Sequence, residues 1–568
     1  MLGSRPLGRY RRVIAVFTIL VAGGTSIGDD NPPGPDAPIL TVTAKSLQTF
    51  KDQASYLLKL GDRPDLAQQL DAIMSLGVAE RAFGVDTKRP LGATFRFEDK
   101  TSVARLLVPV ADEGQALRLL ESLPSKPREI GKGIFSLSPP RPLPEIYFRL
   151  GKGWLVAATT VKASKLPSED PNEDLLTRVG DADLVATLDI QAAPEWARED
   201  IVHRAEQVFA KAINSFGRPP SPLELLGMAL LTAQMNYGVD FLRAGDEIRL
   251  AYRFDQENGN IALTIDATAL DEFRYAEFIK TLDNTQGRLT HLLDEATPFA
   301  LVVGVPVKGP IKEGLINLDA FLQSDAKHSR QLAEERKDAR RQSTLTTWAQ
   351  IVQIYSDLVQ DRMKAGTVDF AFLVDGENGK LEYSSVLETS RGREFATQFS
   401  ETYDAYFRSR IDEYAPRKAT EHREFFVRQH RPIEREIDEY YVDDFATAGS
   451  ETKLIHVHVC DDGALAIQEQ INFLHEVSPR KSDAIVRLHV DVSALCYALG
   501  FMNPETIWRL KDMDNRIRTV MARRDLDFKL DASIRGHEGG LRLVIDANKG
   551  VLALIGRALT IQLGEAGR

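Results

Sequence analysis

Three segments of the chain alternate strictly between hydrophobic and polar residues on both sides of a short polar turn. They are residues 247–267, 367–389 and 526–547, with turns at 255–259, 375–379 and 537–540. Alternation with a period of two is typical of a strand in an antiparallel sheet with one buried face. The Asn-Gly dipeptides in the first two turns supply the positive φ angles that a tight hairpin turn requires. Each segment therefore predicts a β-hairpin.

The surroundings of the hairpins also recur along the chain. A strand-like segment precedes each hairpin, at residues 183–190, 298–305 and 483–490. Hydrophobic residues three or four apart, typical of amphipathic helices, lie between strand and hairpin and again after the hairpin. A second recurring element, at residues 108–114 and 457–463, joins a strand to an acidic helix start. We predict an α+β fold in which antiparallel sheets are built from repeated strand-helix-hairpin-helix units, with the helices packed on one face.

This pattern predicts the organisation of the whole chain. Its parts are a signal peptide at 1–28, a flexible leader rich in Pro, Gly and Asp at 29–42, a first α+β half at 43–325, a charged connecting helix at 326–365 and a second α+β half at 366–568. The length fits two to four domains. The charged segment around residue 336 is interpreted as a connecting helix or as an exposed one.

The first 28 residues have the layout of a cleavable secretory signal. Four arginines precede any acidic residue, and a hydrophobic run at 13–22 and several small residues follow them. The hydrophobic run is shorter than the roughly 20 residues that span a bilayer. We expect cleavage before Asp29, with cleavage after Gly23 or Gly24 as the alternative, and no membrane span once the signal is removed. The expected location is extracytoplasmic, either secreted or periplasmic.

Charge and cysteine content narrow the classes of partner. The net charge is −11, and it becomes −15 when the four arginines leave with the signal. An acidic chain is repelled by phosphate backbones and anionic lipid surfaces, which argues against nucleic-acid binding. The expected partner is a protein or a component of the cell envelope. Cys460 and Cys496 are compatible with a disulfide outside the cytoplasm, but a chain of this size folds without one.

A family resemblance accompanies these observations. It rests on five segments, at residues 94–97, 108–110, 133–135, 146–149 and 153–157. Together they resemble exported bacterial proteins that carry a repeated domain of unknown function. The resemblance implies an extracytoplasmic compartment and a repeated architecture, and it implies no activity.

The sharpest candidate for chemistry is the group His456, His458 and Cys460. Alternate residues of a strand share one face, so two imidazoles and a thiol there suit a zinc or copper ion. In the related segment at 108–114, however, the positions of His458 and Cys460 hold Pro109 and Ala111. We therefore interpret the group as strand surface and keep metal binding as the weaker alternative.

Other patterns have structural interpretations. The acidic turns at 255–259 and 375–379 resemble the start of a calcium loop, but strands flank them where a calcium loop has helices. An acidic, aromatic run at 434–445 is interpreted as a loop edge or an interaction segment, and the Ser-x-x-Lys pattern at 478–481 falls in a loop. We expect no catalytic residues and no cofactor.

These observations favour a non-enzymatic exported protein with a binding or scaffolding role. Two alternatives stay open. One is a carrier that holds an apolar ligand between sheet and helices. The other is a hydrolase whose carboxylates are far apart in sequence and come together only in the fold.

Overall fold

The computed structural model describes residues 37–75, 84–98, 101–121, 127–131, 133–138, 145–214, 237–282, 285, 287–289, 292–293, 297–377, 380–410, 419–430, 444–459, 463–476, 484–498, 520, 523, 526–537 and 540–566. The described strands pair antiparallel throughout, and helices accompany them, so the fold is α+β with antiparallel sheet. Contacts divide the chain into two compact units. Unit 1 is Met1–Tyr56, Pro64–Ser215 and Gly238–Phe254, and unit 2 is Leu57–Arg63, Phe216–Tyr237 and Asp255–Arg568.

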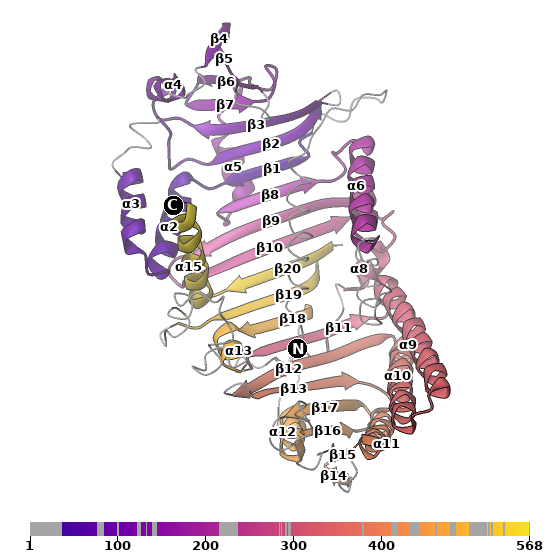
Figure 1. Cartoon of the computed structure of the whole chain (residues 1–568). Helices are drawn as coiled ribbons and strands as arrows, with labels where there is room; N and C mark the ends of the chain where they lie inside the picture. The colour runs from indigo at the N-terminus through magenta and orange to yellow at the C-terminus, as the bar shows by residue number, and fades with distance from the viewer. Residues whose placement is uncertain are drawn as a thin grey trace. The chain divides into compact units, whose positions relative to one another are not determined.

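Unit 1 contains nine strands among its described residues. They are β1 (Leu40–Ala44), β2 (Leu91–Glu98), β3 (Thr101–Pro109), β4 (Arg128–Gly131), β5 (Ile134–Leu137), β6 (Ile146–Gly151), β7 (Trp154–Ala158), β8 (Leu184–Asp189) and β9 (Gly245–Asp255). Their pairings give the order β4-β5-β6-β7-β3-β2-β1-β8-β9. The central part of this order, β3-β2-β1-β8-β9, is visible in Figure 1.

Unit 1 also contains helices among its described residues. They are α3 (Pro64–Ser75), α4 (Glu113–Glu121), α5 (Asn172–Val179) and α6 (Glu195–Asn214), and α2 (Leu47–Leu60) begins in unit 1. Helix α5 lies on β1 and β8. It comes close because β2 has a glycine at position 92, and a Cβ there would stand 2.6 Å from Leu175.

Unit 2 contains eleven strands among its described residues. They are β10 (Asn260–Ala269), β11 (Phe299–Pro306), β12 (Thr367–Glu377), β13 (Lys380–Glu388), β14 (Thr420–His422), β15 (Phe425–His430), β16 (Asp444–Gly449), β17 (Lys453–Val459), β18 (Ala484–Asp491), β19 (Lys529–His537) and β20 (Gly540–Ala547). Their order is β14-β15-β16-β17-β13-β12-β11-β18-β19-β20-β10 (Figure 1). The predicted hairpins at 367–389 and 526–547 are β12–β13 and β19–β20.

The helices of unit 2 include a long pair. They are α8 (Ala276–Leu282), α9 (Gly309–Glu335), α10 (Ala339–Ala365), α11 (Gly392–Arg410), α12 (Gly463–Glu476), α13 (Val492–Ala498) and α15 (Lys549–Ala566). Helices α9 and α10 lie side by side and run in opposite directions. Asp338 begins α10 by accepting a hydrogen bond from the backbone N–H of Arg340 at 3.0 Å, as a helix N-cap does.

The segment predicted as one charged connecting helix, 326–365, thus contains parts of two helices with a break between Glu335 and Ala339. Both helices lie inside unit 2, and the last point at which the chain passes from unit 1 to unit 2 comes earlier, between residues 254 and 255.

Helices cover both faces of the sheet at β15–β17, so the expectation of helices on one face is wrong there. Ile455 and Val457 of β17 belong to one hydrophobic cluster with Ile467 of α12. Leu454, the neighbour of Ile455, belongs to a second cluster with Phe399 of α11. Because adjacent strand residues point to opposite faces, α11 and α12 cover opposite faces. A strand that is covered on both faces can carry hydrophobic residues on both faces.

Several predicted features lie outside the described residues. These are the signal peptide at 1–28 and most of the leader at 29–42, Cys460, the segment at 478–481 and nearly all of the run at 434–445. Among the described residues, no helix is both long enough and hydrophobic enough to cross a bilayer.

Candidate functional site

The two predicted histidines lie on β17, beside aromatic rings. His458 stands opposite Tyr383 of β13 in the strand register. This pairing brings the two rings into a stack with centroids 4.7 Å apart and planes inclined by 6°. The ring of His456 lies 6.2 Å from that of Tyr403, which projects from α11. Both histidines therefore pack against tyrosines.

A third histidine, which the sequence reading did not single out, completes the cluster. His430 ends β15 and is fully buried, and its Nδ1 lies 3.1 Å from Oδ1 of Asp404 on α11. The other carboxylate oxygen of Asp404 forms an ion pair with Arg428. The ring of Tyr403 lies 5.8 Å from that of His430. We call His430, His456, His458, Tyr403 and Asp404 the histidine cluster.

Desolvation makes the imidazoles of His430 and His456 poor proton acceptors. The pKa of His430 is lowered by burial, and Asp404 offsets this only in part. Desolvation, together with His430 and His458 nearby, lowers the pKa of His456 to about 4. Both rings are neutral near pH 7.

A neutral imidazole is a suitable metal ligand, but geometry also matters. Within the described part of the chain, no three His, Cys, Asp or Glu side chains converge as metal ligands do. Cys460 lies outside that part. The described geometry of the cluster is that of packing and hydrogen bonding between α11 and β15–β17.

The acidic side chain in the turn at 255–259 stabilises the turn itself. Oδ1 of Asp255 accepts the backbone N–H groups of Glu257 and Asn258 at 3.0 and 3.1 Å, and Oδ2 accepts the Asn258 amide at 2.7 Å. Gly259 takes a φ of 68°, which glycine adopts without strain. The carboxylate of Asp255 thus orders its own loop.

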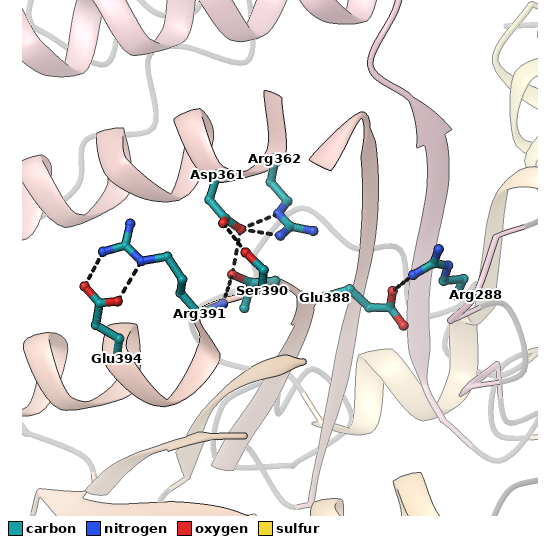
Figure 2. Close-up of polar contacts among 8 residues, drawn as sticks. Arg288, Asp361, Arg362, Glu388, Ser390, Arg391 and Glu394 are labelled. Carbon is teal, nitrogen blue, oxygen red and sulfur yellow. Dashed lines mark hydrogen bonds and ion pairs between the residues drawn. The ribbon is translucent and has the colours of Figure 1, made fainter. Parts of the chain in front are cut away.

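A second polar cluster joins α10 to the start of α11 (Figure 2). The carboxylate of Asp361 accepts hydrogen bonds from the hydroxyls of Thr389 and Ser390 at 2.8 and 2.7 Å, and it pairs with Arg362. Burial acts to raise the pKa of Asp361, but the hydrogen bonds from Arg362, Ser390 and Thr389 outweigh it and bring the pKa down to about 2. Asp361 and Arg362 are both buried. The buried carboxylate of Asp361 thus has hydrogen-bond and ion-pair partners, and these contacts connect α10 to the segment that precedes α11.

Two further ion pairs flank this link in Figure 2. Arg391 pairs with Glu394 and stacks over the ring of Phe395 at 4.8 Å. Arg288 donates to Glu388 at 3.0 Å. Each carboxylate already has a cationic partner, so none is poised as a general base.

A site of another kind lies on the hydrophobic face of unit 1. An open hollow of about 310 Å³ lies over β1, β2, β3 and β7. In the register, Leu40 stands opposite Phe95, Phe95 opposite Ala104, and Leu106 opposite Ala157. Alternate residues point to the same face, so these side chains share one surface.

The hollow exists because small and large side chains alternate across the strands. Ala93, Ala104 and Ala157 are too short to fill the space between Phe95 and Leu106. Leu106 remains 40% exposed, although large hydrophobic side chains are usually buried. A cavity of roughly 300–1,000 Å³ with hydrophobic walls is the usual form of a small-molecule site.

The sequence offered a partial signal for this hollow. The alternation of β2 and β3 shows which residues share a face, but it does not show which strands are neighbours. β3 pairs with β7, and only that pairing places Ala157 beside Leu106, which comes 51 residues earlier in the sequence. The three alanines could not be recognised as a site before this pairing was known.

Comparisons with family models, with curated proteins and with solved structures found no match to this chain. Its function is therefore inferred from its own residues.

Proposed function

We propose that the protein is a non-enzymatic binding protein whose unit 1 holds a hydrocarbon group in the hollow over β1, β2, β3 and β7. The observation that carries the proposal is the hollow itself. Nine of its twelve lining residues are hydrophobic, and the other three are Thr94, Arg105 and Thr159. Removing a hydrocarbon chain from water into such a space is favourable by roughly 0.8 kcal/mol per buried methylene group.

The same lining argues against the hydrolase alternative. It contains no Asp, Glu or His that would transfer a proton to a bound ligand. The rings of His430 and His456, in contrast, are packed under α11, and burial lowers their pKa values. A site with hydrophobic walls and no acid or base binds a ligand without transforming it.

Binding of a fluorescent hydrophobic probe, N-phenyl-1-naphthylamine, tests the proposal. The probe should bind the wild-type protein and brighten. The substitution Ala93→Phe puts a ring into the hollow, and we expect affinity to fall about tenfold or more, since 1.4 kcal/mol of lost contact is tenfold in Kd. Equal affinity of wild type and A93F would contradict the proposal.

A matched control separates filling the hollow from adding a ring. Thr101 is exposed at the start of β3 and does not line the hollow. The variant Thr101→Phe adds the same side chain there and should bind the probe as the wild type does. The urea midpoint of each variant shows that the fold persists.

We also propose that the chain contains two copies of one structural unit. The strand order β4-β5-β6-β7-β3-β2-β1-β8-β9 of unit 1 has the same pairings as β14-β15-β16-β17-β13-β12-β11-β18-β19 of unit 2. In each case a helical segment separates the first strand from the next hairpin, β2–β3 or β12–β13. In this matching β12–β13 corresponds to β2–β3 and not to β19–β20. A structural superposition of the two units checks it, and strand-by-strand disagreement would refute it.

Export is the third part of the proposal. The arginines and hydrophobic run of residues 1–28 support a signal peptide, a secreted or periplasmic location and a partner in the cell envelope. Sequencing the N-terminus of the protein after expression in a bacterium should give Asp29. Recovery of a chain that still begins at Met1 from the cytoplasm would contradict export.

A further inference from the structure

The hydrophobic face that carries the hollow continues beyond it as a trough across β2, β1 and β8. The strand register aligns Ala93 of β2 with Val42 of β1, and Val42 with Ala186 of β8. Residues that stand opposite each other in paired strands point to the same face, so these short side chains lie in one row. Ala93 and Val42 line the hollow, whereas Ala186 lies outside it. We call these three residues the floor of the trough.

Larger side chains stand on both sides of the floor. On β2 they are Leu91 and Phe95, and on β8 they are Leu184 and Leu188, each two residues away from a floor residue. Alternate residues of a strand share a face, so these four side chains form two ridges along the floor. The ridges are four residues apart on each strand, which is about 13 Å between their Cα atoms. The trough between them is the width of a single methylene chain.

One ridge is held in place by packing. Phe95 and Leu188 both lie against a buried cluster of Ile39, Ala192 and Ala193. A ridge that is supported in this way keeps its position without a ligand. The trough is therefore preformed, as most small-molecule sites are.

The two faces of these strands differ in what covers them. Thr43, Gly92 and Val185, each next in sequence to a floor residue, are buried. Helix α5 lies on that face, and its Leu175 would stand 2.6 Å from a Cβ at Gly92. The three floor residues, in contrast, are only partly buried. A contiguous hydrophobic surface that stays accessible usually marks a binding site.

We propose that the trough binds one long unbranched acyl chain, which lies across the strands with one end in the hollow. The inference rests on the proposed function of the hollow and names the shape of its ligand. Hollow and trough together extend over β7, β3, β2, β1 and β8, which is four strand spacings or about 19 Å. One acyl chain of a membrane lipid extends about 15 Å, half of the hydrocarbon core of a bilayer.

The surface fits a hydrocarbon chain better than a peptide segment. The floor and ridge side chains are all Ala, Val, Leu or Phe and have no hydrogen-bonding group. Strands β2, β1 and β8 are each paired on both sides, so they have no free backbone edge for a peptide. A peptide backbone would lose its hydration there without gaining partners. An α-helix with its side chains is about 10–12 Å wide, more than the ridge side chains leave open.

Calorimetric titration with octanoate, dodecanoate and hexadecanoate tests the proposal. Affinity for the wild-type chain should rise along this series by about twofold per methylene group, since an open trough removes about half of the chain's surface from water. Phytanate, a methyl-branched form of hexadecanoate, should bind about fivefold more weakly than hexadecanoate because its branches collide with the ridges. A lysophospholipid with the hexadecanoyl chain distinguishes a lipid from a free acid, and the tighter ligand identifies the source of the chain.

The variant Ala186→Phe puts a ring across the trough outside the hollow. Affinity for hexadecanoate should fall about tenfold, while octanoate and N-phenyl-1-naphthylamine, which the hollow alone accommodates, should bind as they do to the wild type. Ala186→Val fills less of the trough and should cause a smaller loss of the same kind, so it replaces A186F if that variant does not fold. Thr101→Phe is the matched control and should leave every affinity unchanged.

The outcomes separate this inference from the proposed function. If the probe binds and A93F weakens it, but hexadecanoate binds no more tightly than octanoate, the inference is overturned and the function of the hollow stands. The same holds if A186F and A186V leave the affinity for hexadecanoate unchanged, or if phytanate binds as tightly as hexadecanoate. A wild-type dimer that A186F converts to a monomer in sedimentation would assign the trough to a second copy of the chain and overturn the inference. A wild-type chain that binds neither probe nor acid would overturn both.

Discussion

At the scale of single residues, the histidine cluster couples folding to pH. His430 and His456 have lowered pKa values in the folded chain, while an unfolded histidine titrates near 6.5. Above pH 6.5 the rings are neutral in both states and their contribution to stability is complete. As the pH falls below 6.5, the unfolded chain takes up protons first. Stability is therefore lost between about pH 6.5 and pH 4.

We expect the free energy of unfolding to drop by on the order of 1 to 2 kcal/mol between pH 7.5 and pH 5 on account of His456. Urea unfolding at the two pH values measures this drop. The variant His456→Gln keeps a polar side chain without a proton to gain in this range, so its drop should be smaller. A pH dependence unchanged in H456Q would contradict this assignment.

Part of the histidine cluster could be predicted from the sequence. Placing His456 and His458 on one strand needed only the alternation of residues. His430, Asp404 and Tyr403 come from β15 and α11, and no local pattern connects these segments to β17. These residues come together because β15, β16 and β17 pair in one particular register. That register depends on packing between distant parts of the chain.

At the scale of elements, the contact of α11 with β16 depends on two glycines. A Cβ at Gly449 would stand 2.1 Å from the carbonyl oxygen of Gly392, at the start of α11. We expect Gly449→Ala to lower the free energy of unfolding by about 1–3 kcal/mol, the usual cost of overpacking.

Gly314 offers the opposite case. It lies within α9, and a Cβ there would meet nothing within 4 Å. Because alanine has the higher helix propensity, Gly314→Ala should stabilise the protein by up to about 1 kcal/mol. Thermal unfolding of both variants measures the pair of effects. A stabilised G449A, or a strongly destabilised G314A, would show that the packing around these glycines differs from this description.

The elements themselves were the most predictable part of the fold. Strands β12, β13, β19 and β20 occur where the alternation predicts them, because one side of each strand is more hydrophobic than the other. The prediction was wrong about the layers at β15–β17. Helix α12 carries its own hydrophobic stripe, and the sequence does not reveal which face of the sheet that stripe covers.

At the scale of the whole molecule, the account rests on one binding surface within unit 1. One face of its sheet offers a hollow to a hydrocarbon group. The strand register was needed to gather the residues of this hollow, because they come from strands that are far apart in the sequence.

Native mass spectrometry of the purified protein, with and without an added long-chain fatty acid, tests the central claim most directly. The wild-type chain should retain one hydrocarbon ligand per chain, and A93F should retain little, while T101F behaves as the wild type does. A wild-type chain that retains no ligand, or an A93F chain that retains as much as the wild type, would contradict the proposal that the hollow is a binding site.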